Sequence, residues 1–522
     1  MSKEFNITSA CNPYKNYMVD ISNKFNQVKK MIDDARYFVI NRARQFGKTT
    51  MLYTINQRLG EDYLVLRISF ESMDDKSWQD SEAFCKSFCQ KIEKVLLSKS
   101  TCDEYINYWH NVKENLASIE DLSLCINRFC LKCPQKVILI IDEVDQASNN
   151  DLFIKFLRML RDLYNERIAE NNYQLTFYSV ILAGVYDIKN LKLKIRPEDQ
   201  HKVNSPWNIA SEFNVDMSFN PEEISTMLIE YENDVHTNMN ISEISNEIYK
   251  YTSGYPVLVS MICKEIDENF GKVWTIENIV NVVKYLINKD SDQFILIDDL
   301  LKNIEIYPDL KKIIRAILLE NIQFDYTVNN TTLKLAKIFS FIKKSKSGKI
   351  EIHNLIFQQV LYNYFITENI IANLIREPNK NTYIHNGILD MPLIITRFKD
   401  LMYQEYRQRD NQFIEKQCRL LFLCFLKPII NGTGFYYVEP ETRDNSKMDL
   451  VVTYGGQEFV IELKVWHGDK YETDGKEQLA EYLNTRNLKE GYLVSFSFLK
   501  EKDVSKAEWI TEGDKKIFEA II

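Results

Sequence analysis

The chain has 522 residues, a formal net charge of −9 at pH 7 and 45% hydrophobic residues, a composition typical of a globular protein with about three domains. No apolar run approaches the roughly 18 residues that a membrane-spanning helix needs, and the first 15 residues lack the apolar core of a signal peptide. We therefore expect a cytoplasmic protein with no membrane partner, while the negative charge does not exclude nucleic acid, whose binding depends on local patches.

Ten cysteines are scattered along the chain, most of them in apolar helical surroundings. The CxxC pair formed by Cys130 and Cys133 lacks the second pair of ligands that a zinc site needs. We therefore interpret the cysteines as reduced, buried and structural.

Residues 1–215 alternate strand-like and helix-like segments. Between the strand-like runs, residues 152–167 place apolar side chains at helical spacings of three and four. The runs themselves are short, rich in Val, Ile and Leu, and apolar on both faces, as buried parallel strands are; they lie at residues 37–41, 63–69, 137–141 and 177–183. The alternation predicts an α/β fold with a doubly wound parallel sheet, the core of a P-loop NTPase.

The segment from Tyr37 to Leu52, YFVINRARQFGKTTML, indicates a strand, a tight turn and the start of a helix. This order suits nucleotide phosphates, because backbone N–H groups and a helix N-terminus supply positive charge, a Lys reaches the β- and γ-phosphates, and a Thr hydroxyl binds Mg²⁺. Arg42 stands where the usual P-loop has its first glycine, so the pattern is degenerate. The predicted ATP-binding residues of the loop are Arg44, Gln45, Phe46, Gly47, Lys48, Thr49 and Thr50.

A second acidic motif follows about 95 residues later, where the apolar run VILII ends in Asp142 and Glu143. A buried strand ending in these residues places a carboxylate at the edge of the sheet, beside the P-loop. We expect Asp142 and Thr49 to hold Mg²⁺, and Glu143 to polarise the attacking water. The alternative is that the two acidic residues merely begin a helix, where negative charge is favoured.

The rest of the chain divides by pattern. Residues 216–294 are helical with a break at Ser253–Pro256, and we predict a helical lid. Residues 295–365 combine short helices with a Gly-turn hairpin, which predicts a winged-helix-like region. Residues 366–394 contain Pro378 and Gly387 and predict a connector. Residues 395–522 then form a second, smaller α/β unit, with a long helical pattern at 395–427 followed by strands.

Four segments of the first part resemble the bacterial AAA-like ATPase family, within the broader AAA/STAND-type P-loop ATPases. They are YFVINRARQFGKTT, IIDEVD, SPWNIASEF and SGYPVLVS, and the likeness covers roughly residues 5–365. The family commonly has Arg at the first glycine position. The resemblance implies that Ser253–Pro256 lies near the nucleotide, that Gly184 follows the sensor strand, and that Arg158 and Arg161 are candidate phosphate sensors. The alternative for these two arginines is a pair of solvated helix charges.

A carboxylate motif lies near the C-terminus, where Asp449 begins one strand-like run and Glu462 and Lys464 lie on the next, after a Gly-Gly turn. Residues i and i+2 of a strand share a face, so Glu462 and Lys464 project together and a hairpin brings Asp449 beside them. We predict that Asp449 and Glu462 ligate Mg²⁺, helped by the Leu463 carbonyl, and that Lys464 polarises the attacking water. The alternative is a salt-bridged, solvated edge strand, although the polar pair interrupts an apolar run, where burying charge needs a reason.

This region resembles the PD-(D/E)XK nuclease superfamily, in its branch fused to AAA-like ATPases. The order helix, three strands, helix and strand over about residues 395–500 matches that fold, as do the segments NGTGFYYVEPETRDNSKMDLVV, FVIELKVWHGDKY and EQLAEYL. The last segment places Gln478 and Tyr482 one helical turn apart, and the resemblance makes Gln478 a further candidate catalytic residue. Met448 replaces the family's Pro, Glu439 corresponds to the acidic residue of its first strand, and Glu415 is a weaker candidate for an extra metal ligand.

The sequence thus predicts an ATPase with a Mg²⁺-dependent nuclease domain that acts on nucleic acid, with DNA favoured, and in which ATP gates the nuclease. Repair, defence or mobile-element biology is a family analogy only. The alternative is a nucleotide-switched sensor or nucleic-acid-binding protein whose nuclease-like domain is inactive. A GTPase is disfavoured, because no N/TKxD-like base-reading motif is present. A second copy of the same chain, in a homo-oligomer, is a further candidate partner.

Overall fold

The computed structural model divides into two compact units, Met1–Val282 with Leu335–Ser340, and Val283–Lys334 with Phe341–Ile522. No helix among the described residues is long and apolar enough to cross a membrane. The predicted domain boundaries, after residues 215, 294, 365 and 394, stay predictions. The structure describes residues 3–99, 101–147, 150–185, 207, 209–288, 295–319, 322, 324–326, 330–345, 348–373, 382–406, 411–430, 434–439, 448–465, 475–477, 479–480, 482–484, 486–496 and 506–522.

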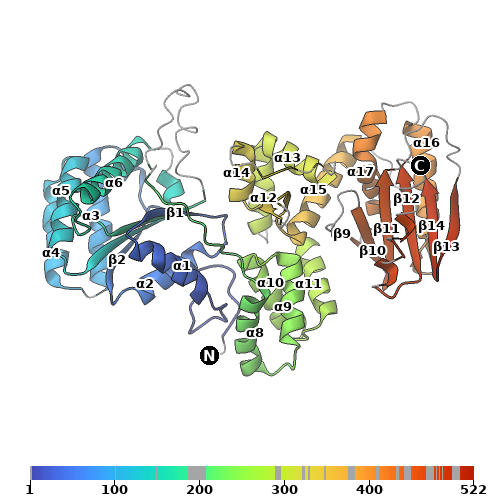
Figure 1. Cartoon of the computed structure of the whole chain (residues 1–522), viewed down its shortest axis with the longest axis horizontal. Coiled ribbons are helices and arrows are strands. Elements are labelled where there is room, and N and C mark those ends of the chain that lie inside the picture. The colour runs from blue at the N-terminus through green and yellow to red at the C-terminus, as the bar shows by residue number, and fades with distance from the viewer. Residues whose placement is uncertain are drawn as a thin grey trace. The chain divides into compact units, whose positions relative to one another are not determined.

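A parallel sheet lies at the centre of the first unit (Figure 1). Its strand order is β1-β4-β3-β2 among the described residues, and each neighbouring pair is parallel. Almost every side chain of the four strands is buried, which explains why their sequences are apolar on both faces. The α/β fold with a parallel sheet is thereby confirmed. The strands are β1 (Tyr37–Asn41), β2 (Tyr63–Ser69), β3 (Lys136–Asp142) and β4 (Ser179–Gly184).

Helices cover both faces of this sheet (Figure 1). One face packs against α3, α5 and α6 through a core rich in aromatic residues and cysteines, and both Cys130 and Cys133 lie in it as free thiols. The buried residues of α1 and α2, such as Phe25 and Ile55, lie outside this core. The helices of this region are α1 (Ser22–Asp33), α2 (Lys48–Arg58), α3 (Ser81–Ser98), α4 (Asp103–Val112), α5 (Ile119–Lys132) and α6 (Asp151–Ala169), with 3-10 turns η1 (Asp75–Trp78), η2 (Lys113–Asn115) and η3 (Val144–Ala147).

A helical segment follows, with α8 (Pro221–Val235), α9 (Ile241–Thr252), α10 (Pro256–Glu268) and α11 (Ile276–Asn288). α8 begins with Pro221 and a reciprocal capping box between Asn220 and Glu223, which satisfies two of the N–H groups that a helix start leaves unpaired.

The region after this helical segment contains α12 (Ile295–Ile306), α13 (Pro308–Leu319), α14 (Thr331–Ile338), the antiparallel hairpin β5 (Ile342–Lys344) and β6 (Ile350–Ile352), and α15 (Leu355–Asn373). Its assignment as a winged helix stays a prediction.

The second unit contains a six-stranded mixed sheet, counted over the described residues, in the order β13-β14-β12-β11-β10-β9. β9, β10 and β11 are antiparallel neighbours, β11, β12 and β14 are parallel, and β13 closes the sheet as an antiparallel edge. The elements are the small hairpin β7 (Ile384–His385) and β8 (Ile388–Leu389), α16 (Met391–Tyr406), α17 (Asn411–Ile430), β9 (Phe435–Glu439), β10 (Met448–Tyr454), β11 (Gln457–Val465), β12 (Glu490–Phe496), β13 (Ala507–Glu512) and β14 (Lys515–Ile521).

The two faces of this sheet pack against different helices. On one face, the ring of Phe398 from α16 lies 6.4 Å from that of Phe496 on β12, measured between centroids. On the other face, Leu479 and Leu483 pack on Val451, Val460, Leu493 and Ile517. These two leucines belong to a helical stretch at residues 475–484, among which 478 and 481 are not described. We refer to this stretch as the covering helix.

Two expectations about the second unit differ from the structure. The helical pattern predicted over 395–427 falls into two helices, α16 and α17, and residues 407–410 between them are not described. The hairpin of β13 and β14 was missed, because β13 is an edge strand whose alternating residues are only partly covered and carry a weak apolar signal. Its turn uses Gly513 at a φ of 60°.

Candidate functional site

The predicted P-loop lies between the end of β1 and the start of α2. Gln45 and Gly47 have positive φ angles of 56° and 77°, and Gly47 is the N-cap of α2. Alternating left-handed residues before a helix form a concave nest of backbone N–H groups, which binds anions. The loop backbone therefore has the conformation that a phosphate requires.

Lys48 is the first residue of α2 and is folded back on the loop. Its Nζ donates hydrogen bonds to the carbonyl oxygens of Arg42 at 2.8 Å and Ala43 at 2.9 Å. The side chain is buried, and this burial lowers the pKa of Lys48, while the nearby Glu143, Asp145 and Asp142 oppose the shift. The ammonium group is thus held inside the loop by carbonyl oxygens, within electrostatic reach of the acidic residues that follow β3.

Asp142 ends β3 and is 5% exposed. Its Oδ2 accepts a hydrogen bond from Arg67 Nη2 at 3.0 Å. Glu143 follows with a positive φ of 53°, which is uncommon for a residue with a side chain, and its N–H donates to Asp142 Oδ1 at 3.1 Å. Burial raises the pKa of Glu143, and the Asp142 charge raises it further. The turn therefore places a carboxylate that is paired with Arg67 beside one that holds its proton more tightly.

Thr49 and Thr50 lie half-buried in the first turn of α2. The Thr50 hydroxyl accepts a hydrogen bond from the Cys11 N–H at 3.2 Å, so the N-terminal segment touches the P-loop helix. The structure brings Lys48, Asp142 and Glu143 within electrostatic reach of one another.

Arg42 turns away from the centre of the loop. Its Nη2 donates to the Val215 carbonyl at 2.9 Å and the Phe213 carbonyl at 3.4 Å, and the guanidinium carbon lies 5.2 Å from the Phe213 ring centroid. A glycine at this position would make none of these contacts. The residue that departs from the general P-loop motif therefore fixes the chain segment that leads into α8, a role that the sequence did not reveal.

The break at Ser253–Pro256 contacts the P-loop directly. The buried Tyr255 donates a hydrogen bond from its hydroxyl to the Arg44 carbonyl at 2.8 Å, and its ring packs edge-on against Phe46 with centroids 4.6 Å apart. Gly254 has a φ of 71°, and a β-carbon there would lie 1.8 Å from the Phe219 carbonyl oxygen. Only glycine fits this close approach, so Gly254 sets the position of Tyr255.

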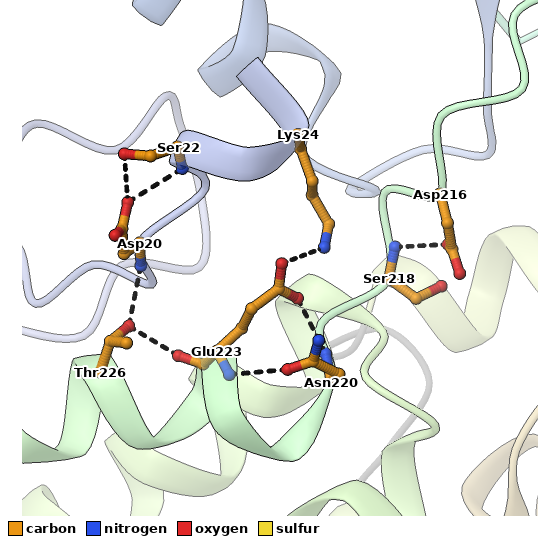
Figure 2. A network of polar contacts seen from close by, with 8 residues as sticks. All are labelled: Asp20, Ser22, Lys24, Asp216, Ser218, Asn220, Glu223 and Thr226. Atoms are coloured by element: carbon orange, nitrogen blue, oxygen red, sulfur yellow. Dashed lines mark hydrogen bonds and ion pairs between the residues drawn. The ribbon is translucent and has the colours of Figure 1, made fainter. Parts of the chain in front are cut away.

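A polar network joins the start of α1 to the start of α8 (Figure 2). The Asp20 N–H donates to Thr226 Oγ1 at 2.8 Å, and Lys24 forms an ion pair with Glu223. The same Glu223 carboxylate accepts the Asn220 N–H at 2.9 Å and completes the cap of α8. These contacts tie the start of α1, which precedes the P-loop, to the start of α8.

Three further predicted positions of the first unit have other surroundings. Arg158 is exposed, and Arg161 lies 3.7 Å from the Asp162 carboxylate. Gly184 ends β4, and a β-carbon there would lie 2.9 Å from Asp145 Oδ1. Asp145 Oδ2 accepts the Val185 N–H at 2.5 Å, so Asp145 links the turn after β3 to the end of β4.

The predicted carboxylate site of the second unit lies on adjacent strands. Asp449 on β10 is paired in register with Glu462 on β11 and with Glu439 on β9, so the three positions form one row across the sheet. Directly opposed residues point to the same face. Glu462 and Lys464 are 2% and 8% exposed, and Lys464 Nζ lies 3.6 Å from Glu462 Oε1. The pair is therefore buried on an interior strand rather than solvated on an edge.

Several predicted residues of this site lie partly or wholly outside the described residues. Gln478 is among them, and for Asp449, Glu439 and Glu415 only the backbone is described. Tyr482 is described and stacks under the Arg486 guanidinium, 5.2 Å from its ring centroid. Within the described side chains, no three His, Cys, Asp or Glu residues form a ready metal-binding cluster.

Comparison with known proteins identifies the first part of the chain. Distant likenesses exist to solved structures: the Walker-type ATPase of Pyrococcus abyssi (13% identity, 68% of this chain and 99% of that chain, TM-score 0.47) and the Aeropyrum pernix ORC2 protein in ADPNP–ADP complexes (12%, 70% and 97%, TM-score 0.33). A third is the Aeropyrum pernix ORC1 protein in complex with DNA (10%, 69% and 95%, TM-score 0.28). No curated protein matches the sequence. The family model described as AAA-like domain matches residues 17–345, more than half of the 522 residues. The chain therefore belongs to the AAA-like domain family.

Proposed function

We propose that the protein is an ATP-binding and ATP-hydrolysing enzyme whose second unit cleaves phosphodiester bonds of DNA with Mg²⁺, under the control of the nucleotide. The observation that carries the nuclease part is the buried Glu462–Lys464 pair in the interior of a mixed sheet, where Glu462 lies in register with Asp449. A buried ion pair contributes little net stability, because the desolvation of both charges offsets their attraction. A chemical role explains why it stands in the middle of an apolar strand.

In the ATP site, the loop from Arg44 to Thr50 supplies N–H groups for the phosphates. Lys48 exchanges its two carbonyl partners for phosphate oxygens when a nucleotide enters. Thr49 and Asp142 offer a hydroxyl and a carboxylate, which are the hard oxygen donors that Mg²⁺ prefers, and the ion neutralises phosphate charge when bound. Glu143 orients the attacking water, and its raised pKa suits a group that accepts a proton.

In the second site, the donor set also fits Mg²⁺. Asp449, Glu462 and the Leu463 carbonyl are oxygen donors at neighbouring positions of β10 and β11, and a bound ion would polarise the scissile phosphate. Lys464 is held beside Glu462 and orients the water that attacks phosphorus. Gln478 is the remaining proposed catalytic residue. The likeness to PD-(D/E)XK nucleases supports these roles.

Control by ATP rests on the fusion of the two units in one chain and on the contacts that the P-loop makes with Tyr255 and with residues 213–215. Nucleotide binding at Lys48 changes the loop that these residues touch. Tyr255 directly precedes α10, and the chain after α10 continues into the second unit. Cytoplasmic location and self-association are part of the same proposal.

The test is cleavage of supercoiled plasmid DNA by the full chain with Mg²⁺, with and without ATP. Lys464→Ala should remove cleavage while ATP turnover continues. Lys516→Ala, an exposed lysine on β14 of the same sheet, is the matched control and should cleave like the wild type. Equal behaviour of wild type and Lys464→Ala would mean that the second unit binds nucleic acid without cutting it. A parallel assay on single-stranded RNA decides the substrate.

A further inference from the structure

A second ion pair, with a buried glutamate, lies on the same face of the six-stranded sheet as Glu462. Glu519 on β14 is paired in register with Leu493 on β12, and Leu493 is paired with Glu462 on β11. The two glutamates therefore share one row and one face, with a single strand between them. Glu519 is 3% exposed, and its Oε1 lies 3.3 Å from Nζ of Lys476, whose side chain is 19% exposed.

Lys476 belongs to the first turn of the covering helix, next to Gly475. That glycine lies directly against Lys464: a β-carbon at position 475 would be 2.5 Å from Lys464 Nζ and 3.0 Å from its Cε. Such distances are well inside van der Waals contact. The position of the Lys464 side chain therefore depends on where the first turn of the covering helix lies.

The covering helix is held at three places along its length. Leu479 and Leu483 pack in the apolar cluster at its middle. Just beyond its far end, Arg486 Nη1 lies 2.7 Å from Glu458 Oε1, but these side chains are 25% and 29% exposed, where an ion pair contributes little. The Lys476–Glu519 pair is more buried than the Arg486–Glu458 pair and is adjacent to Gly475, so it fixes the turn that touches Lys464.

We propose that Glu519 and Lys476 are positioning residues of the cleavage site. Their ion pair fixes the first turn of the covering helix, and Gly475 in that turn keeps the Lys464 ammonium beside Glu462. This inference rests on the proposed phosphodiester cleavage for its consequence in catalysis, whereas the positioning of Lys464 is a property of the structure that can be measured without activity.

The first readout is chemical labelling. The folded full chain is treated with an amine-acylating reagent, and modification of Lys464 is followed by peptide mass spectrometry. Glu519→Gln should accelerate acylation of Lys464 several-fold, because the turn that covers its amine is released. Glu458→Gln removes the carboxylate of the ion pair at the other end of the same helix and should leave the rate unchanged. Equal rates in wild type, Glu519→Gln and Glu458→Gln would overturn the proposal.

The second readout is plasmid cleavage by the same variants. Glu519→Gln should lower kcat by about 10- to 100-fold with little change in KM, because a small displacement of an orienting group impairs the chemical step more than substrate binding. Lys476→Arg keeps the charge and should restore most of the kcat that Lys476→Met loses. A rise in KM with kcat unchanged would contradict a positioning role. So would a failure of Lys476→Arg to restore kcat.

Misfolding and failure of the nuclease are separated by further controls. If Glu519→Gln does not fold, the double variant Lys476→Gln/Glu519→Gln removes both charges and leaves no unpaired one, and it should still expose Lys464 to acylation. If Lys464 in that double variant is acylated no faster than in the wild type, the proposal is overturned. If wild-type protein cleaves no nucleic acid, the proposed function fails, while accelerated labelling in Glu519→Gln would still support the positioning.

Discussion

The two candidate sites are built in opposite ways. The P-loop is local: its chemistry comes from the backbone of consecutive residues, and Lys48 rests on carbonyl oxygens of its own loop. The second site is assembled across strands, and Lys464 is buried beside a carboxylate, with Gly475 from a separate element against it. A local loop can exchange its partners when a ligand arrives, whereas a buried cross-strand pair depends on every element that encloses it. A substitution at the first site should therefore affect few residues outside the loop, whereas a substitution at the second site should affect several of the elements that enclose it.

The largest effect is expected from Glu143→Gln, which should slow ATP hydrolysis by about 10²- to 10⁴-fold and leave ATP binding nearly intact. The amide keeps the shape of the side chain but cannot accept the proton. In the wild type, hydrolysis should fall as the pH drops through the pKa of Glu143, and because this pKa is raised, the loss begins at a higher pH than for an exposed Glu. A pH–rate profile that is unchanged in Glu143→Gln would contradict the assignment.

Lys48→Ala should weaken ATP binding by about 10- to 100-fold, since it removes a charged hydrogen-bond donor to the phosphates. Calorimetric titration with a non-hydrolysable ATP analogue measures the affinity, and Lys94→Ala, at an exposed position of α3, serves as the surface-lysine control. Cleavage without ATP should be unchanged, and stimulation by ATP should disappear. Retained stimulation would show that the two sites are not coupled through this loop.

Gly475→Ala tests the cross-strand construction of the second site. The added methyl group meets Lys464 Nζ and should displace it, lowering DNA cleavage by about 10- to 100-fold. ATP hydrolysis should not change. Gly456→Ala lies at a turn glycine of the same sheet, where a φ of 81° strains an alanine but its β-carbon would meet nothing within 4 Å, so it controls for general destabilisation of the hairpin. Equal cleavage by both variants would remove the argument that Lys464 is held by the covering helix.

Tyr255→Phe is the mildest change. It removes one hydrogen bond to the Arg44 carbonyl and keeps the ring on Phe46, so the net cost is about 1 kcal/mol. ATP affinity should change by about fivefold, in proportion to that energy. A circular-dichroism melt separates loss of fold from loss of affinity. An effect as large as that of Lys48→Ala would show that the loop is less local than described.

The sequence predicted the parts of the molecule that depend on short-range order. The parallel strands follow from apolar runs, and the turn before Lys48 follows from its neighbours, so both could be recognised in advance. The pairing of Glu462 with Lys464 could be expected from their i, i+2 spacing on one strand. These predictions needed no knowledge of how distant segments meet.

Contacts between distant segments could not be predicted. Arg42 reaches the carbonyl oxygens at 213 and 215, and nothing in its neighbourhood along the chain indicates that partner. Glu519 lies on β14, an interior strand of the sheet that was not predicted, and its partner Lys476 comes from the covering helix. The Lys476–Glu519 ion pair forms only because the sheet register brings β14 under the first turn of the covering helix, and this register cannot be inferred from the sequence.

The shared carboxylate of Glu223 has an evolutionary consequence. One oxygen pairs with Lys24 on α1, and the other accepts the N–H of Asn220 to cap α8. Glutamine would keep one acceptor oxygen and lose the charge, and aspartate would be too short to serve both partners. Drift at this position must satisfy two partners at once, so among relatives we expect residues 24, 220 and 223 to change together or not at all.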